Sequence, residues 1–371
     1  MKTYHYLWLI IVLLFSCSKE VIAPEDTGFF KDDKRNFSMG FTSWPYAPTL
    51  DAVNDTYLFL DRSGDVYEEI FPQKVPWKAF INDETLPTAY VDDVYKCVYH
   101  RISGKKMILS VSPLSIFRDN LAPDYDGSLP VYTRFSDATI EDAYFKHLSY
   151  LIENIRPDYL IFAMEVNEIY VHNFMQWQAF KILMKDIEER LRSDFPELPI
   201  SVSITLHSLY EPDITNAGLY QQEVFDFVNQ ADIDFVSVSF YPFFKKLKTK
   251  DKWQQAFDLL YERINKKLAF SETGHISADL EVAAYNFSVT GSQEEQNEFL
   301  KTLLLNAQDH AYEFVIWWTH RDYYQTWLTF PSETQDLGKF WLTTGLLNDD
   351  GGYKEAYFSW MEVYDKPILI N

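Results

Sequence analysis

The feature that most constrains the fold of this chain is an eightfold alternation of short apolar runs with amphipathic segments. The apolar runs are continuous, which is typical of parallel strands that are buried on both faces. The segments between them carry apolar residues at helical spacing. Eight strand–helix units in series predict an α/β fold, a single-domain closed (β/α)8 barrel. The expected strands are at 37–41, 65–71, 105–113, 158–166, 199–206, 233–241, 267–272 and 313–318.

A doubly wound open sheet is the alternative architecture, and the motif content disfavours it. The chain has neither of the glycine-rich phosphate loops GxGxxG and GxxxxGK[ST]. It also lacks the GxSxG, HExxH and CxxC patterns. Nucleotide-binding, serine-hydrolase, zinc-protease and thiol-redox chemistry are therefore disfavoured.

The first twenty residues have the pattern of a secretion signal. Lys2 is followed by an apolar run at 7–15, which is too short to cross a bilayer as a helix. The run ends at Ser16-Cys17, which resembles the lipobox of bacterial lipoproteins. We therefore expect a signal peptide at 1–16, a lipidated Cys17 with a polar tether at 17–35, and the barrel domain at 36–371. An ordinary signal peptide that is cut nearby is the alternative.

Two further expectations follow from this reading of the N-terminus. The protein would be an outer-membrane lipoprotein, at the cell surface or facing the periplasm. Cys97 is the only other cysteine, so no disulfide would form once Cys17 carries lipid, and a buried thiol is expected at position 97.

The charge and the aromatic content narrow the classes of partner. The formal net charge is −22, which argues against nucleic acid, because a phosphate-binding surface needs clustered Lys and Arg. Aromatic residues make up 17% of the chain, which suits a large core and also a sugar-binding cleft. We expect a monomer with a polysaccharide or oligosaccharide substrate.

Two glutamates occupy the ends of strands where catalysis takes place in a barrel of this kind. Catalytic residues sit at the carboxyl ends of the strands. Glu168 follows the fourth strand and Glu272 ends the seventh. Two carboxyl groups that face each other suit glycoside hydrolysis, with one as the acid and the other as the nucleophile. We expect a shielded, protonated Glu168 and an ionised Glu272, whereas Glu165 is expected deeper in the strand in a structural role.

Other side chains at strand ends are candidates for sugar binding, because they are aromatic or can form hydrogen bonds. These candidates are Trp44, Asn167, His207, Tyr241, Trp317, Trp318 and His320.

The combination of Asn167-Glu168, Tyr241, Glu272 and Trp318 at four strand ends resembles the retaining (β/α)8 glycoside hydrolases of clan A. The resemblance implies that Glu168 is the acid/base and Glu272 the nucleophile. It also implies that Asn167 binds the sugar 2-hydroxyl, that Tyr241 orients the nucleophile and that Trp318 forms the floor of the sugar site. No cofactor and no metal ion are implied.

Within that clan, SFYPFF and SETGH are most similar to the endo-β-1,4-galactanases. One departure concerns the second strand, where the clan often carries an Arg that supports the nucleophile. This chain has Glu68 and Glu69 there instead.

Two functions remain open from the sequence. The first is a retaining glycosidase, with the loop at 119–137 shaping the wall of its cleft. The second is a catalytically silent glycan-binding lipoprotein on the same barrel.

Overall fold

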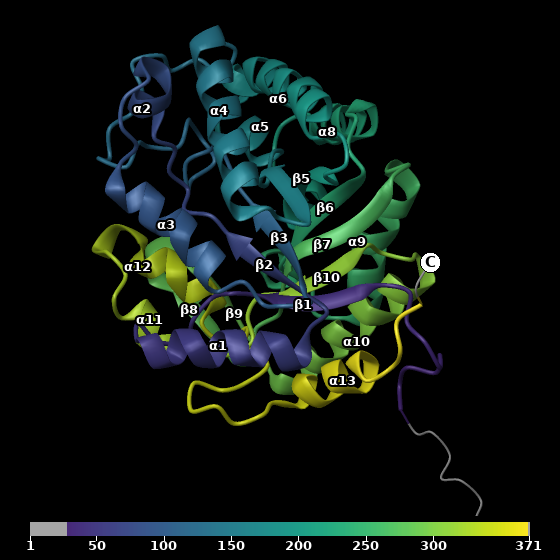
Figure 1. The fold of residues 1–371 in the computed structure, drawn as a ribbon. Coiled ribbons are helices and arrows are strands. Elements are labelled where there is room, and N and C mark those ends of the chain that lie inside the picture. The colour runs from purple at the N-terminus through teal and green to yellow at the C-terminus, as the bar shows by residue number, and fades with distance from the viewer. Residues whose placement is uncertain (1–27, 370–371) are drawn as a thin grey trace, which may run out of the picture.

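The computed structural model describes residues 28–369, and its centre is a closed barrel of eight parallel strands (Figure 1). Neighbouring strands follow the order β1-β10-β7-β6-β5-β4-β3-β2 around the barrel. The predicted (β/α)8 architecture is confirmed, and each expected strand is present. The barrel strands are β1 Ser38–Thr42, β2 Val66–Ile70, β3 Lys106–Ser110, β4 Tyr159–Ala163, β5 Ile200–Thr205, β6 Phe235–Phe240, β7 Lys267–Thr273 and β10 Phe314–Trp317.

Helices surround the barrel, as the helical spacing of apolar residues predicts. Three of them begin at side-chain caps, Thr49 before α1, Asp137 before α4 and Ser292 before α10, each of which accepts a backbone N–H of the first turn. The surrounding helices are α1 Leu50–Ser63, α2 Trp77–Asn82, α3 Thr88–Tyr99, α4 Ala138–Ile155, α6 Phe174–Asp194, α8 Ala217–Gln230, α9 Lys250–Arg263, α10 Gln293–Asp309 and α13 Glu355–Tyr364.

Several short elements, which the sequence did not reveal, lie in the loops after the strands. A two-stranded hairpin of β8 and β9 follows β7, and α11 and α12 follow β10. The short elements are α5 Glu168–His172, α7 Leu206–Leu209, β8 Leu280–Val282, β9 Phe287–Val289, α11 Tyr324–Trp327, α12 Ser332–Gly338 and the 3₁₀-helices Pro242–Lys245, Ala283–Tyr285 and Lys339–Trp341.

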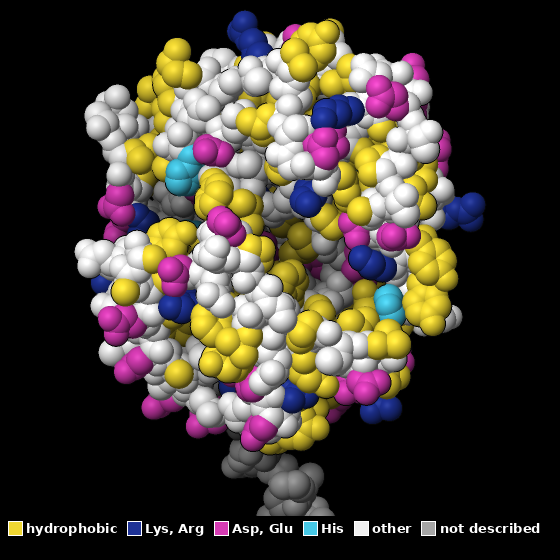
Figure 2. All heavy atoms as spheres, turned by 90° about the vertical axis from the view of Figure 1, so that its left-hand side faces the viewer, with side chains coloured by type: hydrophobic (Ala, Val, Ile, Leu, Met, Phe, Trp, Pro, Cys, Tyr) yellow, Lys and Arg dark blue, Asp and Glu magenta, His cyan; other side chains and the backbone are white. Residues whose placement is uncertain are grey.

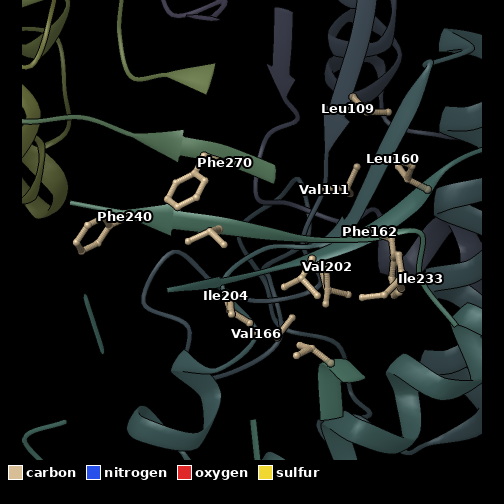
Figure 3. Close-up of a cluster of buried hydrophobic side chains, with 14 of the residues drawn as sticks. Leu109, Val111, Leu160, Phe162, Val166, Val202, Ile204, Ile233, Phe240 and Phe270 are labelled. Carbon is tan, nitrogen blue, oxygen red and sulfur yellow. The ribbon is translucent and has the colours of Figure 1, made fainter. Parts of the chain in front are cut away.

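The main core lies between the barrel and the helices. Figure 3 shows part of it, with Leu109, Phe162, Ile204 and Phe240 projecting from neighbouring strands. Their burial against the helices supplies the hydrophobic free energy that holds the two layers together. Cys97 is a buried free thiol of this core, as predicted.

The inside of the barrel changes from apolar to polar along the strands. The face of β6 that opposes the main core carries Phe235 first and then Ser237 and Ser239 toward its carboxyl end. Glu68 on β2 and Ser110 on β3 are also buried there, and the Ser110 hydroxyl donates to Glu68 at 2.5 Å. Small polar side chains therefore lie beneath the barrel mouth, where bulky branched residues usually fill the interior.

The packed fold begins before residue 36, which corrects the predicted boundary of the tether. Phe30 is fully buried, and its N–H donates to Glu362 Oε1 at 3.0 Å. Arg35 is buried, forms an ion pair with Asp65 and pairs in register with Ile368. Phe30 thus belongs to the main core, and Arg35 lies beside the residue that precedes β2. Residues 1–27, with the expected signal peptide and Cys17, lie outside the described residues. Within residues 28–369, no helix has the length and apolar character needed to cross a membrane.

Candidate active site

Two neighbouring cavities open at the carboxyl ends of the strands, on the side of the molecule where α11, α12 and the β8–β9 hairpin lie (Figure 1). Figure 2 looks onto that side and shows a central hollow bordered by hydrophobic side chains. The first cavity, of about 380 Å³, is called the aromatic pocket because Trp44, Trp318, Tyr323 and Phe330 line it. The second, of about 430 Å³, is called the histidine pocket because it is lined by His172 and His207. The two share the lining residues Ile116, Arg118, Glu165, Leu337 and Trp341.

Glu272 lies in the aromatic pocket at the end of β7. The pairing of β6 with β7 shifts by one residue between Val238 and Ser239, so that Ser239 pairs with Glu272. A bulge of this kind re-aims a side chain. The Tyr241 hydroxyl donates to Glu272 Oε1 at 2.7 Å. The contact that the resemblance implied for Tyr241 is therefore present in the structure.

Glu165 also lies in the aromatic pocket, which corrects the expectation that it is deeper in β4 and structural. The strand ends at Ala163 after a register shift, and Glu165 adopts a left-handed backbone with φ of 52°. Simple alternation along the strand no longer applies at such a position. Its N–H donates to Ser203 Oγ at 2.8 Å. Glu165 is thus fixed at the boundary between the two pockets.

Arg118 pairs with Glu165 across the barrel mouth. Its Nε donates to Glu165 Oε2 at 3.0 Å, and its Nη1 donates to Gln73 Oε1 at 2.8 Å and to Ser115 O at 3.1 Å. Arg118 is buried and, like Glu165, has a positive φ, of 57°. Two non-glycine residues held in the left-handed region and joined by an ion pair are typical of a functional site. The cleft wall from this loop begins at Ile116, earlier than the expected segment 119–137.

The protonation pattern differs from the expected one. Burial and the neighbouring Glu165 carboxylate raise the pKa of Glu272 above its usual value, although Tyr241 and Arg118 act in the opposite direction. Burial also opposes charge on Glu168, but His172, Ser208 and His207 outweigh it and lower the pKa of that carboxyl. Glu272 was expected ionised and Glu168 protonated, and both directions are reversed because the two carboxyl groups have different neighbours from those we expected.

Glu168 lies in the histidine pocket and not beside Glu272. It is the first residue of α5, and its Oε2 is 3.3 Å from His172 Nε2. The neighbouring charge that acts most strongly on Glu272 is that of Glu165. The structure therefore brings Glu272 together with Glu165 rather than with Glu168.

Four of the other predicted residues line the two pockets. Trp44 and Trp318 lie against each other in the aromatic pocket, with ring centroids 5.2 Å apart. Tyr241 and His207 line the histidine pocket, where burial lowers the pKa of His207 to about 4. His207 is thus a neutral ring that can accept or donate a hydrogen bond.

Three predicted residues are buried away from both pockets. Asn167 Oδ1 accepts the Thr205 N–H at 2.6 Å, and its Nδ2 donates to the Tyr220 hydroxyl at 2.7 Å. Trp317 faces the helices, where its Nε1 donates to Thr344 O at 2.8 Å. His320 is buried against the rings of Tyr46 and Phe59, and burial lowers its pKa to about 3. Trp317 is on β10, where alternate residues face opposite sides, whereas Asn167 and His320 lie in the segments after β4 and β10, where strand alternation no longer applies.

Glu68 occupies the inside of β2, where an arginine was expected. It is fully buried, and its Oε2 has no hydrogen-bond partner among the described residues. Burial raises the pKa of Glu68 well above its usual value, and the charge of Glu272 contributes to the rise. A buried carboxyl group whose ionisation is disfavoured therefore lies near the Glu272 carboxyl, in place of a cation.

No metal centre is indicated in the part of the chain that the structure describes, because no three His, Cys, Asp or Glu side chains are grouped there to hold an ion.

Solved structures of known proteins share this fold. An exo-β-1,4-mannosidase from Opitutaceae bacterium strain TAV5 aligns with 92% of this chain and 61% of its own at a TM-score of 0.61 and 12% identity. A psychrophilic family 10 endo-β-1,4-xylanase aligns over 89% of this chain and 96% of its own, at a TM-score of 0.55 and 12% identity. A β-glucuronidase from an uncultured Clostridium aligns over 89% of this chain at a TM-score of 0.53 and 13% identity, and the match spans half of the glucuronidase.

No family model and no curated protein sequence matches the chain. At identities of 12 and 13%, the structural likenesses establish the class of fold, a (β/α)8 barrel.

Proposed function

We propose that the protein is a retaining glycoside hydrolase, with Glu272 as the nucleophile and Glu165 as the general acid/base. One observation carries the proposal: carboxyl groups from β7 and from the end of β4 lie together in a pocket walled by Trp44 and Trp318. Two carboxyl groups flanking a bond and an aromatic wall for a sugar ring are the requirements of glycoside hydrolysis. The fold that this chain shares with a mannosidase, a xylanase and a glucuronidase supports the same class.

Glu165, Glu272 and Tyr241 then have defined tasks in the two steps of the reaction. Glu165 donates a proton to the glycosidic oxygen while Glu272 attacks the anomeric carbon, and the leaving group departs as an alcohol. Water, deprotonated by Glu165, then cleaves the glycosyl–Glu272 ester and restores both carboxyl groups. The Tyr241 hydroxyl, 2.7 Å from Glu272 Oε1, holds the nucleophile in position.

Glu165 replaces Glu168 in the acid/base role for reasons of place and charge. Glu168 lies in the neighbouring pocket, and the pKa of its carboxyl is lowered, since His172, Ser208 and His207 outweigh the effect of burial. A general acid must hold a proton at the working pH. Glu165 has the required position beside Glu272, although it is ion-paired with Arg118, and we propose that a bound saccharide displaces Arg118 so that Glu165 can take up the proton it donates. Arg118 already has Gln73 Oε1 and Ser115 O as other acceptors, so it keeps partners when it is displaced.

The pH profile of Arg118→Met tests this electrostatic arrangement. Arg118 lowers the pKa of Glu272, so its removal raises that pKa further. Because Glu272 must be ionised to attack, the acidic limb of kcat/KM should move to higher pH, by about half a unit or more. The measurement is kcat/KM against pH for the wild type and the variant, with Arg134→Met as a control in the same loop. An acidic limb that stays in place or moves to lower pH would contradict the assignment.

The proposed substrate is a polysaccharide or oligosaccharide, and the SFYPFF and SETGH segments favour β-1,4-galactan. The direct test is release of reducing sugar from a panel of glycans that includes β-1,4-galactan, with purified protein from Gly28 onward. Hydrolysis with retention of anomeric configuration, observed by NMR, supports the proposal. Binding of a glycan without hydrolysis across the panel would favour a silent glycan-binding protein instead.

We further propose that the protein acts at the cell surface or in the periplasm, anchored through Cys17. The support is the Ser16-Cys17 junction after the apolar run. Incorporation of labelled palmitate by the full-length chain, lost in Cys17→Ser, is the expected result. Equal labelling of both chains would contradict the anchor, and an unlabelled wild type that is secreted would indicate an ordinary signal peptide.

A further inference from the structure

We propose that the histidine pocket binds the leaving saccharide unit, and that Glu168 and Thr205 accept and donate hydrogen bonds to its hydroxyls. The proposal rests on the proposed function, because the pocket adjoins Glu165, the group that would protonate the leaving oxygen. It assigns Glu168 to substrate binding instead of acid/base catalysis.

The first observation is that two buried polar atoms in this pocket have no partner. Glu168 Oε1 and Thr205 Oγ1 are both buried and make no hydrogen bond to the described residues. Glu168 is 9% exposed and Thr205 2% exposed, and both line the cavity. Buried polar atoms are nearly always paired, so two such atoms in one cavity point to a polar ligand.

The second observation is that one oxygen of Glu168 is already fixed. Oε2 lies 3.3 Å from His172 Nε2, and this contact is the main cause that raises the pKa of His172. Oε1 is left as a charged acceptor in a low-dielectric site, where hydrogen bonds to charged groups are strong. An ionised carboxylate can accept hydrogen bonds from two adjacent hydroxyls, which a sugar ring presents and a simple alcohol does not.

The third observation is that aromatic rings form part of the pocket wall. Phe244, Tyr285 and Trp341 line it, and Trp341 also lines the aromatic pocket. Tyr285 is 47% exposed at the rim. An apolar wall with a few fixed polar groups suits a pyranose ring, which has apolar faces and a polar edge. The cavity of about 430 Å³ is comparable in size to the aromatic pocket on the other side of Glu165.

The two pockets lie side by side and share a wall, so the cleft has room for two sugar units rather than for one sugar and a small alcohol. The shared wall of Arg118, Glu165 and Trp341 places the proton donor between the pockets. A glycosidic bond at that boundary would put one ring against Trp318 and Glu272 and the next ring against Glu168.

The test compares two substrates with the same reacting sugar. For the sugar that the wild type accepts, kcat/KM is measured on the β-1,4-linked disaccharide and on the 4-nitrophenyl β-glycoside. Only the disaccharide offers hydroxyls to Glu168. In Glu168→Ala the disaccharide value should fall about 10- to 100-fold, as expected when hydrogen bonds to a charged acceptor are lost. The kcat/KM on the aryl glycoside should fall far less. The ratio of kcat/KM on the disaccharide to kcat/KM on the aryl glycoside should therefore drop at least tenfold.

Two variants control for changes in folding and surface charge. Glu168→Gln keeps the size of the side chain and should lie between the wild type and Glu168→Ala. Glu189→Ala changes an exposed glutamate on α6 and should leave the ratio of the two values as in the wild type. Equal loss on both substrates in Glu168→Ala, or restoration of its aryl-glycoside turnover by azide, would overturn the proposal.

A wild type that hydrolyses neither substrate contradicts the proposed function and leaves the pocket to be tested by binding. Tryptophan fluorescence then follows titration with cellobiose, xylobiose, mannobiose and β-1,4-galactobiose. Binding that weakens at least tenfold in Glu168→Ala supports the pocket, whereas binding that is absent in the wild type or unchanged in the variant contradicts it.

Discussion

Glu272→Gln will lower kcat/KM on any accepted glycoside by about 10⁴-fold or more, because the amide cannot form the covalent ester through which the reaction passes. The substitution keeps the shape of the side chain and leaves an acceptor for the Tyr241 hydroxyl, which donates to Glu272 Oε1. The fold should therefore be unaffected, and circular dichroism and the melting temperature check that it is. Steady-state kinetics on an aryl glycoside measures the loss.

The matched control for this prediction is Glu281→Gln on β8, where the side chain is exposed. This variant removes one negative charge from the same side of the protein and should retain the wild-type rate. Retention of more than about 1% of activity in Glu272→Gln would contradict the nucleophile assignment.

Glu165→Ala will show the second largest effect, and its size will depend on the leaving group. Loss of a general acid/base costs about 10²- to 10⁴-fold where the leaving oxygen needs a proton. A 2,4-dinitrophenyl glycoside departs without protonation, so its glycosylation step should be nearly spared. Azide should raise turnover in this variant and give the β-glycosyl azide, because the small anion attacks the glycosyl–enzyme in place of the activated water.

Glu168→Ala is the comparison that separates the two candidate acids. If azide accelerates Glu168→Ala and not Glu165→Ala, the acid/base is Glu168 and the assignment of Glu165 is wrong. Removal of Glu165 also leaves Arg118 buried with Gln73 and Ser115 as its remaining partners. Thermal stability of the variant therefore has to be measured alongside its rate, since an unpaired buried charge is destabilising.

The strands and their order could be predicted because the pattern that reveals them is local. Continuous apolar runs and intervening helical spacing are properties of short segments, and they correctly gave the barrel and its helix α13. The same local reading placed Glu272 and Trp318 at the ends of β7 and β10, where both line the aromatic pocket. The direction of each side chain was harder to predict. Trp317, the last residue of β10, faces the helices, whereas the adjacent Trp318 lines the aromatic pocket.

The place of Glu165 could not be predicted because it depends on backbone geometry and on a partner that is distant in sequence. A register shift near the end of β4 and a left-handed residue turn Glu165 into the pocket, while strict alternation places it elsewhere. Arg118 lies 47 residues earlier in the chain, in a loop, and pairs with it. Nothing in the sequence around Arg118 signals such a contact, because loop paths are set by tertiary packing.

Asn167 shows that a short motif does not by itself predict the role of a side chain. The Asn-Glu dipeptide after β4 suggested a sugar-binding amide and a catalytic acid, but the amide holds the end of β5 through Thr205. Asn167 is the N-cap of α5 and Glu168 its first residue, so the dipeptide follows the end of β4 by several residues. A dipeptide match is therefore weaker evidence than the position at which the backbone leaves the strand.

The sequence showed that Glu68 stands on the second strand where clan A enzymes often have an arginine, and the structure shows the surroundings of this carboxyl group. Glu68 is a buried carboxyl group that accepts a hydrogen bond from Ser110, and burial raises its pKa well above the usual value. An arginine at this position would stabilise the ionised form of Glu272, whereas charge on Glu68 would oppose it. The rise in the pKa of Glu272 itself comes from burial and from the charge of Glu165.

The most direct test of the Glu272–Glu165 pair is to trap the covalent intermediate and locate it. The protein is incubated with a 2,4-dinitrophenyl 2-deoxy-2-fluoro-β-glycoside of the accepted sugar, digested, and mapped by mass spectrometry. A fluorine at C2 slows both steps, and the dinitrophenolate leaving group lets the first proceed, so that the intermediate accumulates. We predict one glycosyl adduct per chain, on Glu272. An adduct on Glu165 or Glu168, or turnover with inversion and no adduct, would contradict the mechanism.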